Sequence, residues 1–227
     1  MVPVVPTTLS PAAIDAAPEL RDWRYLLGRL ETTYRCGTFG AAGRLAAAIA
    51  DAADGSGHHP DLDLRYPDVL HVALTTHAAG AETTDLDAAL AVTIGELAAT
   101  AAARCEPVAA QGYEIAVDAM DIDAVRPFWE AVLGYRPLQR RPGGPVNLVD
   151  PARLGPVVWF QQMDEPRPGR NRIHVDVTVA HDVAAARVEA ALAAGGVLVS
   201  DADARSWWVL ADVEGNEVCI CTWLDRD

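Results

Sequence analysis

The sequence contains no lysine, because all 18 of its basic residues are arginine. Schiff-base enzymes, pyridoxal-phosphate enzymes held by a lysine and Walker-type phosphate loops all need a lysine amine. Those classes are therefore excluded. The 32 acidic residues give a formal net charge of -14. This charge disfavours a nucleic-acid partner, since duplex affinity depends largely on cations that neutralise phosphates.

Long apolar runs and paired-cysteine motifs are also missing. No apolar segment reaches the roughly 18–20 residues of a membrane span, so we expect no membrane association. The first residues lack the basic region and apolar block of a secretory signal. The four cysteines (Cys36, Cys105, Cys219 and Cys221) form no C-x-x-C pair. We therefore expect a cytoplasmic protein with reduced thiols.

The chain is predicted to be α+β in two domains, residues 1–105 and 110–227, because proline and glycine interrupt the pattern between them. Helices are predicted from Ser10-Pro11, over residues 41–53 and from Thr84-Asp85, and a half-buried strand over residues 70–75, which His77 ends. The first domain is therefore expected to be a small antiparallel sheet with helices on one face.

The second domain contains an internal repeat. A strand, YEIAVDAM, leads into a helix that ends at Gly134, and RIHVDVTV leads into a helix that ends at Gly195. Each copy then continues into strand-like segments. Two βαβββ units in tandem are the simplest interpretation, since a single unit would leave one sheet face uncovered.

Four of the six histidines (His58, His59, His71 and His77) fall within residues 58–77. Histidine both donates and accepts protons near neutral pH, so several around one pocket favour the addition or removal of water. Asp54 stands four residues before His58, where its carboxylate could orient an imidazole. A three-histidine zinc site is an alternative, although adjacent histidines do not match the usual ligand spacing. A second alternative is that these histidines are polar surface residues without a catalytic role.

The order HHPDLDLRY, HVALTTH and then DAALA resembles the pterin-4a-carbinolamine (4a-hydroxytetrahydrobiopterin) dehydratases over roughly residues 18–102. The resemblance implies loss of the 4a-hydroxyl of a pterin without a metal or other cofactor. It assigns catalysis to His58, His59 and His77, with His59 and His77 the essential pair and His58 holding the hydroxyl. It assigns substrate binding to Asp54, Thr75, Thr76 and Asp87. Asp85 is an alternative to Asp87.

The chain departs from this family in its spacing. Ten residues separate Tyr66 from His77, where the family usually has nine, which predicts a bulge at Tyr66-Pro67. The segment Gly80–Thr83 replaces the usual Gly-Gly-Leu-Thr. These differences bear on substrate fit more than on the chemistry.

The second domain resembles the glyoxalase-like, or vicinal-oxygen-chelate, proteins through DAMDIDAVRPFWEAVLGY, RIHVDVTVAHD and ADVEGNEVCI. The resemblance implies a cupped sheet that holds a divalent metal or sequesters a small molecule. Glu114 and His174 match metal positions, but Cys219 replaces the usual glutamate, which leaves hard oxygen ligation incomplete. Arg140 and Arg141 could hold an anion or be solvated. Four aromatic residues could line the cup or belong to the core: Trp159, Phe160, Trp207 and Trp208.

The sequence thus predicts a pterin dehydratase that assembles as a homo-oligomer, the latter by analogy with the family. One alternative is a small-molecule-binding protein whose first domain has lost activity. Another is a metal-dependent lyase or dioxygenase centred on Glu114 and His174.

Overall fold

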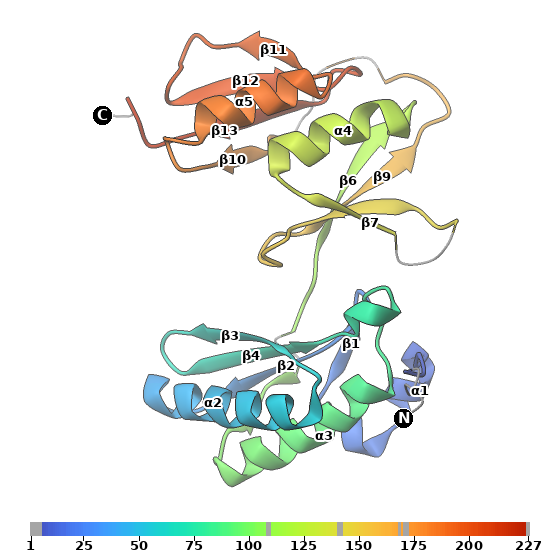
Figure 1. Cartoon of the computed structure of the whole chain (residues 1–227), viewed down its shortest axis with the longest axis vertical. Coiled ribbons are helices and arrows are strands. Elements are labelled where there is room, and N and C mark those ends of the chain that lie inside the picture. Colours follow the sequence, from blue (N-terminus) through green and yellow to red (C-terminus); the bar gives the residue numbers. More distant parts are fainter. Residues whose placement is uncertain (1–5, 108–109, 140–142, 168, 170–172, 226–227) are drawn as a thin grey trace. The chain divides into compact units, whose positions relative to one another are not determined.

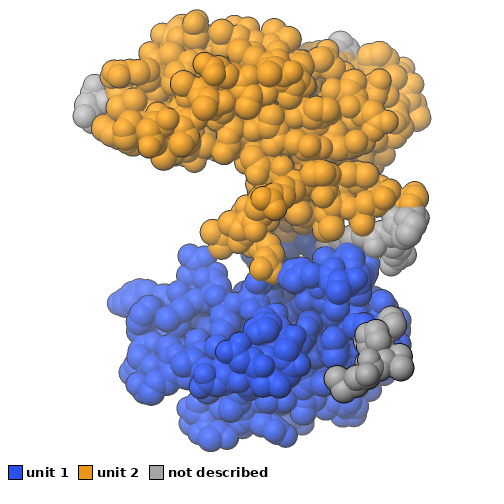
Figure 2. Space-filling view, in the orientation of Figure 1, with its two compact units in different colours: residues 1–112 blue, residues 113–227 orange. Residues whose placement is uncertain are grey.

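The computed structural model describes residues 6–107, 110–139, 143–167, 169 and 173–225; Arg140 and Arg141 lie outside them. The chain forms two compact units, residues 1–112 and 113–227 (Figure 2). Each unit has its own hydrophobic core, and the fold is α+β as predicted. Among the described residues, no helix combines the length and apolar character that crossing a bilayer requires.

Unit 1 is an antiparallel sheet whose two long helices cover the same face (Figure 1). Its elements are α1 (Pro11–Asp15), η1 (Pro18–Leu20), β1 (Arg24–Leu26), β2 (Arg29–Arg35), α2 (Phe39–Ser56), β3 (Asp61–Arg65), β4 (Val69–Leu74), η2 (His77–Ala79), α3 (Asp85–Thr100) and β5 (Arg104–Cys105). The strand order is β1-β2-β4-β3, and β5 pairs with β2. Alternating apolar residues such as Leu30 and Val72 pack against Ile49 of α2 and Ile94 of α3.

Two local predictions around β4 are wrong. The β3–β4 register runs without interruption from Asp61 opposite Ala73 to Arg65 opposite Val69. The additional residue is therefore absorbed by the turn at residues 66–68, and Tyr66-Pro67 forms no bulge. The strand also ends at Leu74, so His77 begins the 3-10 helix η2 instead of ending β4.

Unit 2 consists of two βαβββ modules, as predicted. The first contains β6 (Glu114–Ala119), α4 (Ile122–Leu133), β7 (Arg136–Gln139), β8 (Val146–Val149) and β9 (Val157–Gln162). The second contains β10 (Asp176–Thr178), α5 (Ala184–Ala193), β11 (Val197–Ser200), β12 (Trp207–Ala211) and β13 (Glu217–Cys221). Their sheets have the equivalent orders β6-β9-β8-β7 and β10-β13-β12-β11. The same topology in both modules explains the sequence repeat.

The four aromatic residues of unit 2 divide between two environments. Phe160 is buried in the core beneath the helices, and Trp208 packs against that core. Trp159 and Trp207 are half-buried, and alternation along their strands turns them to the opposite face of the sheet. The core interpretation therefore holds for Phe160 and Trp208, and a cup lined by Trp159 and Trp207 stays a prediction.

The turn between β12 and β13 joins the two modules. Asp212 is buried and accepts a hydrogen bond from Trp129 Nε1 of α4 at 3.0 Å. Glu214 accepts hydrogen bonds from the backbone N–H groups of Met120 and Asp121, just before α4. Asp212 and Glu214 of the DVEGNE segment therefore hold one module to the other.

Candidate active site

His58 is placed by the turn that connects α2 to β3. Gly57 ends α2 in the left-handed conformation, with φ of 70°, where a residue with a side chain would be disfavoured. His58 follows, and its Nε2 lies 2.7 Å from Oδ1 of Asp87. The His58 side chain is 12% exposed and that of Asp87 is 0% exposed. The His58 imidazole is therefore hydrogen-bonded to a carboxylate that solvent does not reach.

Asp87 is held in place by the beginning of α3. Thr84 is the N-cap of that helix, and Oδ2 of Asp87 accepts the Thr84 backbone N–H at 2.7 Å, which completes a capping box. The Thr76 hydroxyl donates to the same Oδ2 at 2.8 Å. The hydroxyl oxygens of Thr76 and Thr84 are 2.7 Å apart. One buried network therefore contains three of the predicted site residues: His58, Thr76 and Asp87.

His59 forms a separate pair with Asp54, the residue of α2 that stands four positions before His58. His59 Nε2 lies 3.0 Å from Asp54 Oδ1, and the side chains are 60% and 81% exposed, respectively. This pair is largely exposed to solvent, whereas the His58 side chain is mostly buried and that of Asp87 is fully buried. Two adjacent histidines thus have carboxylate partners in opposite environments.

The remaining predicted residues fall into different places. His77 is exposed at the start of η2 and directly follows Thr76. Thr75 is buried, and its hydroxyl donates to the Gly28 carbonyl. Asp85 accepts a hydrogen bond from the Thr7 backbone N–H. Asp87, not the alternative Asp85, is therefore the carboxylate that meets His58.

His71 belongs to a different cluster on the sheet. Its Nδ1 lies 3.2 Å from the Thr33 hydroxyl and its Nε2 lies 3.6 Å from a Glu31 carboxylate oxygen. These partners come from β2, which pairs with β4. The four clustered histidines of the sequence therefore do not share one set of contacts.

Thr84 also belongs to the network, although no motif of the sequence predicted a role for it at the site. Its position is readable as Thr-x-x-Asp before an apolar run, a variant of the capping box. The sequence indicates the cap, but the cap's connection to Thr76 depends on the tertiary fold.

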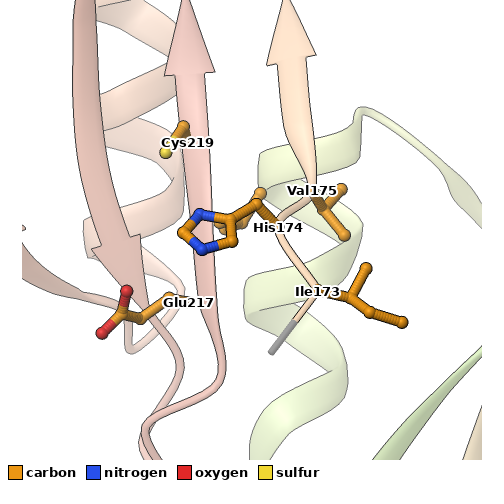
Figure 3. A pocket seen from close by; sticks show the side chains of 6 residues that line it. Ile173, His174, Val175, Glu217 and Cys219 are labelled. Atoms are coloured by element: carbon orange, nitrogen blue, oxygen red, sulfur yellow. The ribbon is translucent and has the colours of Figure 1, made fainter. Parts of the chain in front are cut away.

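In unit 2, His174, Glu217 and Cys219 line a pocket of about 10 Å³ together with Ile173, Val175 and Val218 (Figure 3). That volume holds about one water molecule. Burial, with a smaller contribution from the Asp176 carboxylate, raises the pKa of Cys219 to about 11. Within the described ranges, no group of three or more His, Cys, Asp or Glu side chains is arranged to hold a metal ion.

The first unit is thus an α+β domain whose histidine–carboxylate pairs suit acid–base chemistry, and the second is a tandem βαβββ domain. Residues 7–97 match the family model "Pterin 4 alpha carbinolamine dehydratase", and residues 114–221 match "Glyoxalase-like domain". The chain belongs to the pterin-4-alpha-carbinolamine dehydratase family through its first unit and carries a glyoxalase-like domain in its second.

The similar proteins described below each cover less than half of this chain. A Chloroflexus aurantiacus protein named "Putative pterin-4-alpha-carbinolamine dehydratase" is 42% identical over 76 residues, which are 34% of this chain and 80% of the relative. A protein of the same name from Herpetosiphon aurantiacus is 40% identical over 94 residues, which are 41% of this chain and 96% of the relative. A solved glyoxalase/bleomycin resistance protein/dioxygenase family enzyme from Burkholderia phytofirmans is 21% identical, covers 48% of this chain and 95% of its own, and has a TM-score of 0.39.

Proposed function

We propose that the chain is a hydro-lyase that removes water from 4a-hydroxytetrahydropterin and releases quinonoid dihydropterin. Histidine acid–base catalysis without a metal drives the reaction, with His58, His59 and His77 in contact with the substrate. The observation that carries the proposal is the pairing of adjacent His58 and His59 with Asp87 and Asp54, at ring-nitrogen distances of 2.7 and 3.0 Å. Family membership supports the substrate class.

The reaction needs two proton transfers that balance. An acid gives a proton to the 4a-hydroxyl as the carbon–oxygen bond breaks, and water leaves. A base accepts a proton from a ring nitrogen of the pterin, which leaves the product neutral. Histidine is suited to both roles near neutral pH. His59 and His77 are both exposed, and we assign these transfers to them, with His58 holding the hydroxyl.

Burial separates the residues that can touch the substrate from those that act through others. Asp54 is exposed and stands beside His59, which supports a direct contact with the pterin. Asp87 is fully buried, and the buried hydroxyls of Thr75 and Thr76 donate to Gly28 and Asp87. We therefore propose that Asp87 reaches the substrate only through His58, and that Thr75 and Thr76 contribute backbone atoms at most.

The test is a stopped-flow assay of the full chain with freshly generated 4a-hydroxytetrahydropterin, followed by the loss of its absorbance. The proposal expects the protein to accelerate the decay well above the spontaneous rate, equally with and without a chelator. No acceleration would remove the dehydratase function. Acceleration that a chelator abolishes would instead favour the metal-dependent alternative in the second domain.

A further inference from the structure

The hydrogen bonds around the buried Asp87 carboxylate indicate which ring nitrogen of His58 carries the proton. An ionised carboxylate only accepts hydrogen bonds. Oδ2 of Asp87 receives the Thr84 backbone N–H at 2.7 Å and the Thr76 hydroxyl at 2.8 Å. These contacts need no proton on the carboxyl group. With the carboxylate ionised, the proton in the 2.7 Å contact between Oδ1 and His58 lies on Nε2 of the imidazole.

The two threonine hydroxyls can be assigned in the same way. Each hydroxyl has one proton to donate. The Leu86 backbone N–H donates to Thr84 Oγ1 at 3.2 Å. Thr84 Oγ1 in turn lies 2.7 Å from Thr76 Oγ1, but 3.3 Å from Asp87 Oδ2. The shortest contacts therefore form a chain in which Thr84 donates to Thr76 and Thr76 donates to Asp87.

We infer that Thr76 and Thr84 are positioning residues which, through Asp87, keep neutral His58 protonated on Nε2 and leave Nδ1 as a proton acceptor. A neutral imidazole carries one ring proton, so protonation at Nε2 leaves Nδ1 with a lone pair. The structure shows no hydrogen-bond partner for Nδ1 in the part of the chain that it describes. Both threonines and Asp87 are buried, so solvent does not compete for these contacts.

This inference deepens the proposed function and rests on it for its catalytic meaning. With Nδ1 as an acceptor, neutral His58 receives a hydrogen bond from the 4a-hydroxyl and does not protonate it. The proton that converts the leaving hydroxyl to water must then come from His59 or His77. The same carboxylate caps α3, so the helix start and the His58 orientation depend on one side chain.

The first test reads the tautomer directly, without substrate. In protein labelled with ¹⁵N-histidine, two-bond ¹H–¹⁵N correlation spectra distinguish protonated from unprotonated ring nitrogens, and the His58 signals are assigned by their loss in His58→Gln. The inference expects a protonated Nε2 and an unprotonated Nδ1 when His58 is neutral. A neutral His58 with its proton on Nδ1 would overturn it, whether or not the protein is a dehydratase.

The second test compares Thr76→Val with Thr76→Ser, which keeps the hydroxyl. Loss of one hydrogen bond worth about 1 kcal/mol should lower kcat about fivefold in Thr76→Val, leave KM near wild type and add signals of the Nδ1-protonated form. Thr76→Ser should keep kcat and the His58 tautomer as in wild type. Unchanged tautomer and kcat in folded Thr76→Val would refute the positioning role. If that variant does not fold, the wild-type spectrum still decides the His58 tautomer, without which the inference falls. Absence of dehydration with the expected spectrum refutes only the proposed function.

Discussion

The residues Asp87 and Asp54 each pair with a histidine, but burial makes their contributions to stability different. Asp87 accepts hydrogen bonds from a helix N-terminus, a threonine and His58 inside the protein. Asp54 is largely in solvent, where ion pairs contribute little because water and salt screen them. The contrast can be measured.

Replacing Asp87 by alanine should lower the free energy of unfolding by about 2–4 kcal/mol, since it removes a cap and leaves buried donors unsatisfied. Asp54→Ala is the matched control and should unfold close to wild type. Urea denaturation followed by circular dichroism measures both. Equal stability of the two variants would contradict the buried network.

The thiol of Cys219 provides a pH-dependent prediction at the same scale. Burial and the negative charge of Asp176 raise its pKa to about 11, so the thiol stays protonated at pH 8 and reacts slowly with iodoacetamide. Its alkylation rate, followed by peptide mass spectrometry, should rise with pH up to about 11. Asp176→Asn should lower the pKa and speed alkylation at pH 8. A rate that levels off below pH 9 in wild type would contradict the raised pKa.

Among the elements of unit 2, α5 (Ala184–Ala193) packs so closely against α4 that Gly196, three residues beyond the end of α5, must be small. A Cβ on Gly196 would lie 2.4 Å from Phe128 Cδ2 and 2.8 Å from the Ala191 carbonyl oxygen. Phe128 is itself buried in the core and cannot move without disturbing α4. By contrast, a Cβ on Gly43 of α2 meets nothing within 4 Å.

Gly196→Ala should therefore destabilise the protein by about 1–3 kcal/mol through overpacking. Gly43→Ala should stabilise it by about 0.5–1 kcal/mol, because alanine favours a helix interior. Thermal unfolding should show a lower melting temperature for Gly196→Ala and a higher one for Gly43→Ala, although both replace glycine by alanine. A stabilised Gly196→Ala variant would show that the α4–α5 packing is looser than described.

Across the whole molecule, the two units have separate cores. We therefore propose that residues 1–112 and 113–227 fold independently. Each fragment, produced alone, should give a dispersed ¹H–¹⁵N spectrum and cooperative thermal unfolding. The dehydratase activity should remain with the first fragment. A fragment that stays unfolded would contradict independence. Light scattering on the intact chain tests the homo-oligomer that the family resemblance predicts.

The fold was predictable from the sequence where the hydrophobic periodicity of a segment matches the helix or strand that it forms. The βαβββ repeat is visible because each module uses the same order of alternating strands and amphipathic helix. The prediction at Tyr66-Pro67 was wrong, because spacing alone does not reveal whether a turn or a strand absorbs an additional residue.

The residues of the candidate site remain a prediction from the sequence, and most of their contacts could not be predicted from it. His59 and Asp54 lie close together in the sequence, and their pairing follows from one helix end and one turn. The contact of His58 with Asp87 joins residues 29 positions apart, and the Thr84–Thr76 link depends on how α3 begins beside the end of β4. Neither has a periodic signal in the sequence.

The proposed chemistry is tested most directly by kcat of His77→Ala beside His71→Ala in the full chain, with the 4a-hydroxytetrahydropterin assay. His71 is the control because its contacts are with Thr33 and Glu31 on the sheet. Loss of an acid–base group should lower kcat by about 100-fold or more in His77→Ala, while His71→Ala should keep nearly the wild-type value. A His77→Ala enzyme that dehydrates at the wild-type rate would contradict the account.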